Sequence, residues 1–197
     1  MPQISAAEFF ALPLRVHTFL AGVPLHDAWA VDLPRSRERV TLAEFNPLEN
    51  QVGRLPAPVR ALFRLRFFLG RIFRLEAEPK GARRTSFAGR LTPEDRARSS
   101  VEAGTPKGLF RVVYRFENES LLEVHNRTAH AAALSALAGT ADGYRFYFAV
   151  YVTKASWITP LYMALIDPFR RWFVYPALLR NIHARWLEFV SSRNDDR

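Results

Sequence analysis

The stretch that decides the fold spans residues 109–154 and contains four apolar segments separated by short polar turns. The segments read LFRVVYRFE (109–117), SLLEVHNR (120–127), AHAAALSALA (129–138) and YRFYFAVYVTK (144–154). The Asn, Asp and Gly residues between them tolerate the backbone angles that tight connections require. We therefore predict a meander of four successive antiparallel strands that forms the frame of the protein.

Alternation along these strands predicts which side chains share a face of the sheet. One face would collect Phe110, Val112, Tyr114 and Phe116 of the first strand and Tyr144, Phe146, Phe148, Val150 and Val152 of the fourth. The pattern predicts one apolar face that is covered and one wet face. The third strand is rich in alanine, which leaves room on the sheet either for a ligand or for a closely packed helix.

Composition limits the classes of protein that this chain can form. With 197 residues and 49% hydrophobic content, the chain suffices for a single domain with a substantial core. There is no cysteine, which excludes disulfides, thiol nucleophiles and thiolate zinc sites. The first residues show no basic segment followed by an apolar run, so we expect no secretory signal and a cytoplasmic location.

The charge is strongly positive, with 28 basic against 19 acidic residues. A positive field attracts phosphates of nucleic acids and of anionic membranes. The arginines are dispersed along the chain, however, and are not massed in one tract. We therefore predict no nucleic-acid partner and retain only a weak contact with an anionic membrane surface.

Helical signals come before the meander. Ser5 is placed to cap a short helix with Glu8 three residues further on, and a second helical piece is expected over 14–21. An alternating segment with Trp29, Val31 and Leu33 on one side predicts a first strand. We expect an N-terminal helical extension over residues 1–26 and a single domain over 27–197.

The region between the first strand and the meander combines a helix with a long connection. Residues 58–75 carry a broad apolar stripe opposite an arginine face, which predicts an amphipathic helix packed on the sheet. Residues 76–108 are polar and rich in Gly and Pro, which indicates a long surface connection with one helical turn starting at Thr92. Such a connection is either a lid or a simple linker.

The C-terminal third is the most aromatic part of the chain. We predict a long helix, kinked near Pro176, whose sheet-facing side carries Phe169, Trp172, Phe173, Pro176, Leu179, Ile182, Trp186, Phe189 and Val190. Prolines and charges interrupt it well short of the roughly 20 apolar residues that a membrane span requires. Asp167, just before Pro168, is interpreted as the cap of this helix.

Three stretches resemble a known family: PLHDAW (24–29), LFRLRFFLGRIF (62–73) and DPFRRWFVYPALLRNI (167–182). They are similar to an uncharacterised bacterial group, the domain-of-unknown-function family 2867, within the START/polyketide-cyclase-like (SRPBCC) superfamily. The resemblance implies an α+β helix-grip fold, with an antiparallel sheet wrapped around a long C-terminal helix. It also implies a cavity for an apolar molecule between sheet and helix, and it brings no agreed catalytic residues.

Candidate site residues follow from these expectations. The predicted ligand-binding residues are Tyr114, Phe116, Phe146, Phe148, Trp172 and Phe173. His125 and His130 lie on adjacent predicted strands with Glu123 near by, so they are candidate polar groups of the pocket. The histidines lack metal-ligand spacing and no cofactor motif is present, so we expect no metal and no cofactor. No catalytic residue is assigned.

Three functions remain open at this point. The leading hypothesis is non-enzymatic binding of a hydrophobic small molecule, lipid-like or aromatic, in the cavity between sheet and C-terminal helix. The second is a cyclase-like or hydratase-like enzyme that uses a pocket Tyr, His or Arg to polarise a carbonyl. The third is a peripheral membrane or protein-interaction module, and a homodimer is a further expectation.

Overall fold

The computed structural model describes residues 3–35, 39–45, 85–126, 130–153 and 159–195. The predicted helix at 58–75 and the first part of the polar connection lie outside the described residues. In chain order the elements are α1 (Ala6–Phe10), α2 (Arg15–Phe19), β1 (Leu25–Pro34), the 3-10 helix η1 (Phe87–Arg90), α6 (Pro93–Arg98), β2 (Pro106–Lys107), β3 (Phe110–Arg115), β4 (Glu119–His125), β5 (His130–Thr140), β6 (Gly143–Thr153), α7 (Thr159–Phe169), the π-helical turn η2 (Arg170–Val174) and α8 (Tyr175–Asp195).

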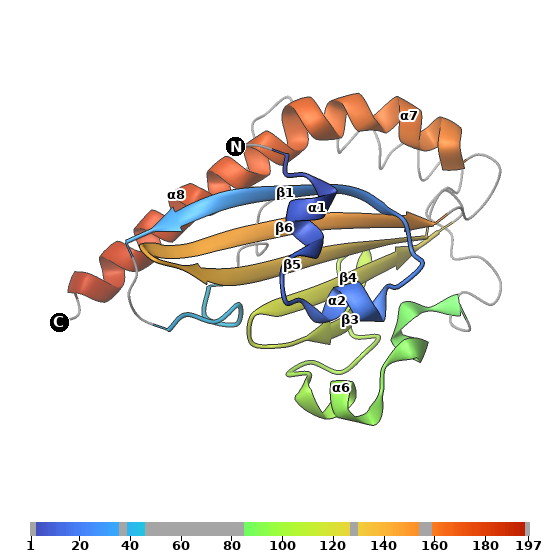
Figure 1. Cartoon of the computed structure of the whole chain (residues 1–197), viewed down its shortest axis with the longest axis horizontal. Coiled ribbons are helices and arrows are strands. Elements are labelled where there is room, and N and C mark those ends of the chain that lie inside the picture. The colour runs from blue at the N-terminus through green and yellow to red at the C-terminus, as the bar shows by residue number, and fades with distance from the viewer. Residues whose placement is uncertain (1–2, 36–38, 46–84, 127–129, 154–158, 196–197) are drawn as a thin grey trace.

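An antiparallel sheet organises the molecule. Its six strands lie in the order β1-β6-β5-β4-β3-β2 (Figure 1). The four-stranded meander and the separate first strand are confirmed, and β1 joins the sheet beside β6, with Trp29 opposite Phe148. The protein is therefore an α+β protein with a six-stranded antiparallel sheet and a long C-terminal helix.

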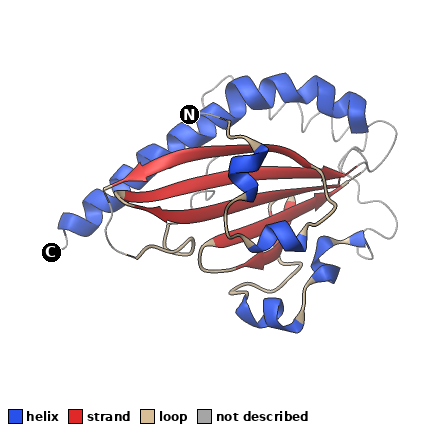
Figure 2. Cartoon of the chain, in the orientation of Figure 1, coloured by secondary structure: helices blue, strands red, loops and turns tan. Residues whose placement is uncertain are grey.

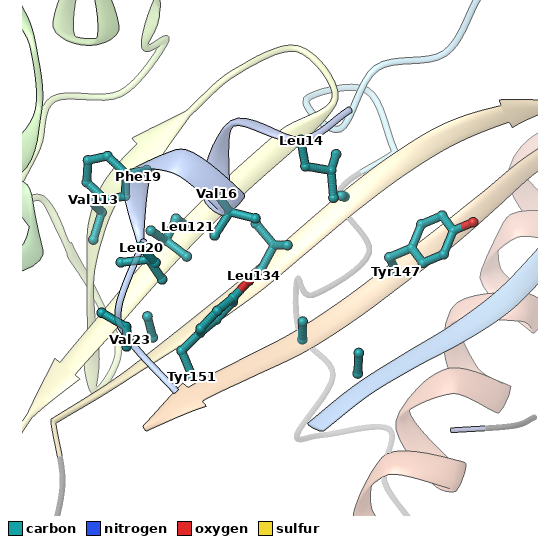
Figure 3. Close-up of a cluster of buried hydrophobic side chains, with 14 of the residues drawn as sticks. Leu14, Val16, Phe19, Leu20, Val23, Val113, Leu121, Leu134, Tyr147 and Tyr151 are labelled. Carbon is teal, nitrogen blue, oxygen red and sulfur yellow. The ribbon is translucent and has the colours of Figure 1, made fainter. Parts of the chain in front are cut away.

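Both faces of the sheet are covered, so the prediction of one wet face was wrong. In Figure 1, α1 and α2 lie in front of the sheet while α8 crosses behind β1. We call the first side the N-terminal face, whose buried side chains include Phe9 and Tyr114. Figure 3 shows further members of this core: Val16, Phe19, Leu134 and Tyr151. The C-terminal face buries Trp29, Phe146, Phe148, Tyr175, Leu179 and Trp186.

The alanines of the sheet lie mainly on the N-terminal face. Ala28, Ala30, Ala132, Ala136 and Ala149 belong to its core, where the short N-terminal helices pack. Small side chains allow a helix to approach the sheet closely, whereas α8 packs on larger aromatic residues of β1 and β6. The C-terminal helix therefore does not roof the alanine-rich surface, contrary to the expectation from sequence.

A β-bulge changes the alternation in β3. The pairing of β3 with β4 shifts between Val112 and Tyr114. A bulge sets two residues of one strand against one of its partner, so simple alternation fails at that point. Val113 consequently joins Tyr114 and Phe116 on the N-terminal face.

The long C-terminal helix changes its buried side at a π-helical turn. The helical blue ribbons of Figure 2 run from α7 through η2 into α8. Phe169, Trp172 and Phe173 are 45%, 74% and 51% exposed, whereas α8 buries Tyr175, Leu179, Ile182 and Trp186. A π turn closes i→i+5 hydrogen bonds and so offsets the helical phase, which α-helical spacing does not anticipate. The predicted sheet-facing position of the first three aromatics was therefore wrong.

Several local predictions are confirmed. The Ser5 side chain accepts a hydrogen bond from the Glu8 amide at 3.1 Å at the start of α1, and α2 lies within the predicted second helical piece. Thr92 and Asp95 form a reciprocal capping box on α6. Residues 85–108 are more than a surface connection, because η1 and α6 bury Phe87 and Asp95 against the sheet. No helix in the described ranges is long and apolar enough to cross a membrane.

Candidate functional site

Four carboxylates are buried among the described residues: Asp27, Asp95, Glu119 and Glu123. A buried charge is costly unless it is paired and hydrogen-bonded. A buried carboxylate with hydrogen-bond partners in the fold therefore has a structural role, whereas one without such partners is a candidate for a functional role.

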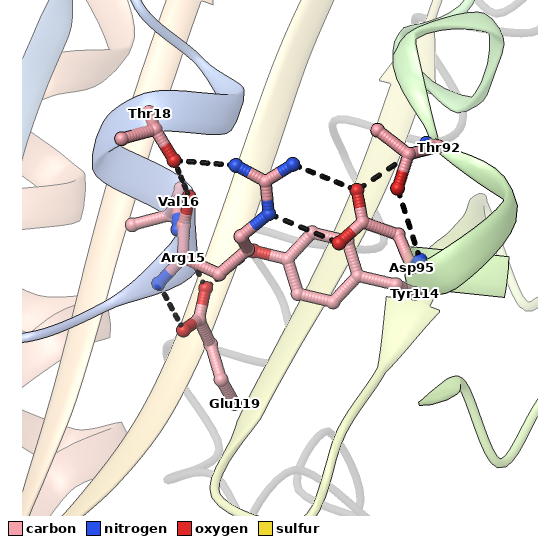
Figure 4. Close-up of polar contacts among 7 residues, drawn as sticks. All are labelled: Arg15, Val16, Thr18, Thr92, Asp95, Tyr114 and Glu119. Carbon is pink, nitrogen blue, oxygen red and sulfur yellow. Dashed lines mark hydrogen bonds and ion pairs between the residues drawn. The ribbon is translucent and has the colours of Figure 1, made fainter. Parts of the chain in front are cut away.

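Glu119 holds the beginning of α2 against the sheet (Figure 4). Its Oε2 accepts the backbone N–H of Arg15 at 2.8 Å, and its Oε1 accepts that of Val16 at 2.9 Å. The Tyr114 hydroxyl donates to the same Oε1. The carboxylate thus satisfies two amides that a helix N-terminus leaves without intrahelical partners. Glu119 therefore has a structural role.

The side chain of Arg15 extends this contact to α6. Its Nε and Nη2 donate to the two Asp95 oxygens at 3.0 and 2.8 Å, in the bidentate geometry that Arg and carboxylate favour. The Arg15 hydrogen bond holds the pKa of Asp95 below its usual value despite the cost of burial. Asp95 also caps α6 through the Thr92 amide at 3.3 Å. This ion pair holds α2 and α6 together.

The predicted convergence of His125 and His130 with a carboxylate is present in the structure. Their rings stack at 4.2 Å, and His130 Nε2 lies 3.5 Å from Glu123 Oε2. Glu123 also accepts the Phe87 amide at 2.8 Å and the Ser86 hydroxyl, at the start of η1. Burial disfavours the ionised carboxylate, but these hydrogen bonds outweigh it and lower the pKa of Glu123. Its oxygens are occupied, so the group serves to fix η1.

The fourth carboxylate belongs to a group that we call the Asp27 cluster: His26, Asp27, Asp167, Arg170 and Tyr175. Two come from the start of β1, and the others come from the end of α7, η2 and the start of α8. His26 Nε2 lies 3.0 and 2.9 Å from the two Asp167 oxygens. Arg170 donates to Asp167 at 3.0 Å and to the Tyr175 hydroxyl. The cluster therefore joins the edge strand β1 to the C-terminal helix.

Asp27 differs from the other buried carboxylates. Its side chain is fully enclosed, yet neither oxygen accepts a hydrogen bond from the described part of the chain. Its nearest cations are Arg170 Nη2 at 3.8 Å and His26 Nε2 at 4.0 Å, both beyond hydrogen-bond distance. Burial raises the pKa of Asp27, although Arg170 and His26 oppose the shift. Burying this carboxyl group without a hydrogen bond costs stability, and the two distant cations offset only part of that cost.

A second polar group without a partner lies two residues along the same strand face. Trp29 is 6% exposed, and its indole N–H donates no hydrogen bond to any of the residues that the structure describes. Its ring meets the Tyr175 ring edge-on at 5.4 Å, as does the ring of Phe148. Buried polar groups almost always have a partner in the protein or in ordered water. Asp27 and Trp29 are thus two buried polar side chains on one face of β1, where the Trp29 ring packs on the Tyr175 ring.

Arg170 and Tyr175 have fixed protonation states in this cluster. Burial opposes the charge of Arg170, but Tyr175, Asp27 and Asp167 outweigh it and raise the pKa of the guanidinium. Burial raises the pKa of Tyr175 as well, so its hydroxyl stays protonated. The cluster therefore presents a permanent cation and a neutral phenol beside a carboxyl group whose proton is held more firmly than usual.

The N-terminal face also carries buried polar atoms without hydrogen bonds, on His17 and Tyr151. His17 contacts the Phe9 and Phe10 rings at 5.0 and 5.2 Å, and burial lowers its pKa towards the neutral form. A neutral imidazole or phenol is far cheaper to bury than a carboxylate. These positions are explained by aromatic packing, and the Asp27 cluster is the stronger candidate.

The structure does not bring the six predicted ligand-binding residues together. Tyr114 and Phe116 lie in the core of the N-terminal face, whereas Phe146 and Phe148 lie on the C-terminal face. Trp172 and Phe173 point outward from η2. The shared-face prediction failed because the bulge in β3 and the π turn each alter the side-chain phase. Of the six, Phe148 lies in the aromatic layer of the Asp27 cluster.

Sequence reasoning missed the roles of His26, Asp27, Arg170 and Tyr175, and it assigned Asp167 as a helix cap. Asp167 instead lies inside α7 and pairs with His26 and Arg170. A signal was present: charged residues within otherwise apolar segments, at 24–29 and 167–182, are the two stretches that meet here. Within the described ranges, no group of three or more His, Asp or Glu side chains is arranged to hold a metal ion.

These features define an α+β protein with an antiparallel sheet covered on both faces and a buried polar cluster beneath its C-terminal helix. The family model described as "Protein of unknown function (DUF2867)" matches residues 19–177, and the chain belongs to this family. The matched range contains all five residues of the Asp27 cluster. Neither the curated proteins nor the solved structures give a match.

Proposed function

We propose that this protein binds a hydrophobic small molecule, lipid-like or aromatic, between the sheet and its C-terminal helix, without catalysing a reaction. The Asp27 cluster receives the polar end of that molecule. The observation that carries the proposal is the enclosed carboxyl group of Asp27, which accepts no hydrogen bond from the described residues and lies on the same face of β1 as the Trp29 indole, which has no partner among them either. Natural cores rarely keep such a pair without a function.

The surroundings of the cluster suit a ligand with an apolar body. Trp29, Phe148 and Tyr175 supply aromatic walls, and Asp27 faces Val150 in the strand register. Binding sites for small molecules are usually apolar with a few well-placed polar groups. The indole N–H of Trp29 and the guanidinium of Arg170 are donors, so the polar end of the ligand is a carbonyl or carboxylate oxygen.

We further propose that the fold is a helix-grip of the START/polyketide-cyclase-like superfamily. The antiparallel sheet with a long terminal helix across one face supports this assignment, as do the sequence stretches at 24–29 and 167–182 that resemble the superfamily. In such an architecture the space between sheet and terminal helix is the binding site. This placement agrees with the position of the Asp27 cluster.

A cyclase-like or hydratase-like enzyme is the second candidate, and the raised pKa of Asp27 favours it. A carboxyl group with a raised pKa beside a histidine suits general acid–base catalysis. Arg170 and the Tyr175 hydroxyl, which are hydrogen-bonded to each other, would polarise a substrate carbonyl. In this alternative the molecule bound at the cluster would be chemically changed.

The variant Asp27→Asn tests the proposal by native mass spectrometry of protein purified from its own cells. Wild-type protein should retain a small molecule, and Asp27→Asn should lose it because the acid group that meets the polar end is gone. Asp32→Asn is the matched control, since Asp32 lies on the same strand with an 81% exposed side chain. Retention that is equal in both variants, or no retained molecule in the wild type, contradicts binding at Asp27. A product that differs in mass between wild type and Asp27→Asn favours the enzyme.

The same variant should not lose stability, which separates a binding role from a structural one. Because burial raises the pKa of Asp27, this carboxyl favours folding below its unfolded pKa and loses that contribution as pH rises through its folded pKa. Asparagine has no such loss, so urea unfolding at neutral pH should show Asp27→Asn equal to wild type or more stable by roughly 0.5–2 kcal/mol. The difference should shrink in acid. A clear loss of stability at neutral pH would assign Asp27 to the fold.

A further inference from the structure

The outer side of the continuous helix formed by α7, η2 and α8 carries an exposed aromatic patch, which consists of Phe169, Trp172 and Phe173. These are three of the five large hydrophobic side chains that are exposed among the described residues, and Trp172 is 74% exposed. The Phe169 and Phe173 rings lie 6.5 Å apart, and Trp172 lies between these two residues in the sequence. Contiguous exposed apolar surface of this kind marks an interaction site. The Asp27 cluster occupies the inner side of the same segment.

Positively charged residues lie near the patch. Arg171 lies between Phe169 and Trp172 in the sequence, and Arg180 is exposed near the start of α8, whereas Arg170 belongs to the Asp27 cluster on the inner side of the helix. The chain as a whole has a net charge of +9. Exposed Trp and Phe beside arginines on a helix is the combination that inserts into the interface of an anionic bilayer. In Figure 1, α7 lies at the upper edge of the view and leads towards α8.

We propose that the patch of Phe169, Trp172 and Phe173 docks this protein on anionic lipid bilayers, with the neighbouring arginines attracting the headgroups. A second copy of the chain is a poorer occupant, because a two-fold contact through this patch would set the arginines of both copies against one another. Docking goes beyond the proposed ligand binding and rests on different residues. It places the ligand site on the far side of the helix that touches the membrane.

Vesicle sedimentation tests the docking. The protein should pellet with phosphatidylcholine vesicles that contain phosphatidylglycerol, bind weakly to pure phosphatidylcholine, and detach in high salt because ions screen the attraction. The variant Trp172→Ser/Phe173→Ser should lower the partition coefficient by roughly tenfold or more, since it removes most of the inserted apolar surface. Tryptophan emission of the wild type should shift to shorter wavelength on binding.

Leu109→Ser is the matched control, because Leu109 is 46% exposed on another part of the molecule and its loss should leave binding unchanged. Both substitutions alter exposed side chains, and near-ultraviolet circular dichroism confirms that the variants are folded. Absence of vesicle binding, equal binding to neutral vesicles, or equal binding of the patch variant overturns the proposal. Self-association of the wild type that the patch variant abolishes, measured by analytical ultracentrifugation, would instead assign the patch to a second copy.

Discussion

Arg170→Met should lower the free energy of unfolding by about 3 kcal/mol at neutral pH, the usual cost of removing one partner of a buried ion pair. Arg170 is 16% exposed in its side chain and lies between two carboxylates, Asp27 and Asp167. Methionine keeps most of the apolar stem but leaves both acids without their shared cation. Urea unfolding of the wild type and the variant measures the difference.

The pH dependence and a second substitution make this prediction specific. Without Arg170 the pKa of Asp27 rises further, so the loss of stability should be largest at neutral pH and should shrink in acid as Asp27 takes up its proton. Adding Asp27→Asn should recover a large part of the loss, because the buried charge is gone. Arg180→Met, at an exposed position of α8, should change stability by less than about 0.5 kcal/mol. A loss that is independent of pH and of Asp27 would refute the electrostatic explanation.

Glu119→Gln should destabilise the protein by roughly 2–4 kcal/mol, since it replaces an acceptor of three hydrogen bonds with a side chain that presents its own donor. The amide nitrogen would face either an α2 backbone N–H or the Tyr114 hydroxyl. We expect the N-terminal helices to detach first. Hydrogen exchange should therefore show lost protection in α1 and α2, with smaller changes in α8.

Glu117→Gln provides the control for this second prediction. Glu117 is two residues away and pairs with Arg39 at 2.7 Å, but both side chains are well exposed, at 50% and 81%. Exposed ion pairs contribute little, so its removal should change stability by less than about 1 kcal/mol. Equal effects at the two positions, or uniform loss of protection across the molecule, would show that Glu119 does not fasten the N-terminal helices.

The sheet was predictable from sequence because its signal is local. The four strands over 109–154, the Ser5 cap and the Thr92 turn each depend on neighbouring residues, and each is confirmed. The two covered faces were not predictable in this way. The charges on β4 indicate a wet face, yet Glu119 and Glu123 are buried because each accepts the first amides of a covering helix.

The candidate site was only partly predictable for a related reason. His125, His130 and Glu123 were recognised because they lie on adjacent strands, and the structure brings them together. The Asp27 cluster joins residues about 140 positions apart through a π turn, and neither periodicity nor spacing predicts that pairing. The charges in the stretches at 24–29 and 167–182 were the only sequence trace of it.

The indole region of a ¹H–¹⁵N spectrum tests the central claim most directly. Decanoate, a carboxylate with an apolar chain, is titrated into the protein, and the signal of Trp29 is assigned with Trp29→Phe. Binding at the Asp27 cluster predicts a large shift of the Trp29 N–H, which gains an acceptor, and a much smaller shift of Trp186, whose N–H already donates to the Pro34 carbonyl at 2.7 Å. A Trp29 signal that stays in place while decanoate binds elsewhere, or an identical response in Asp27→Asn, would contradict the account.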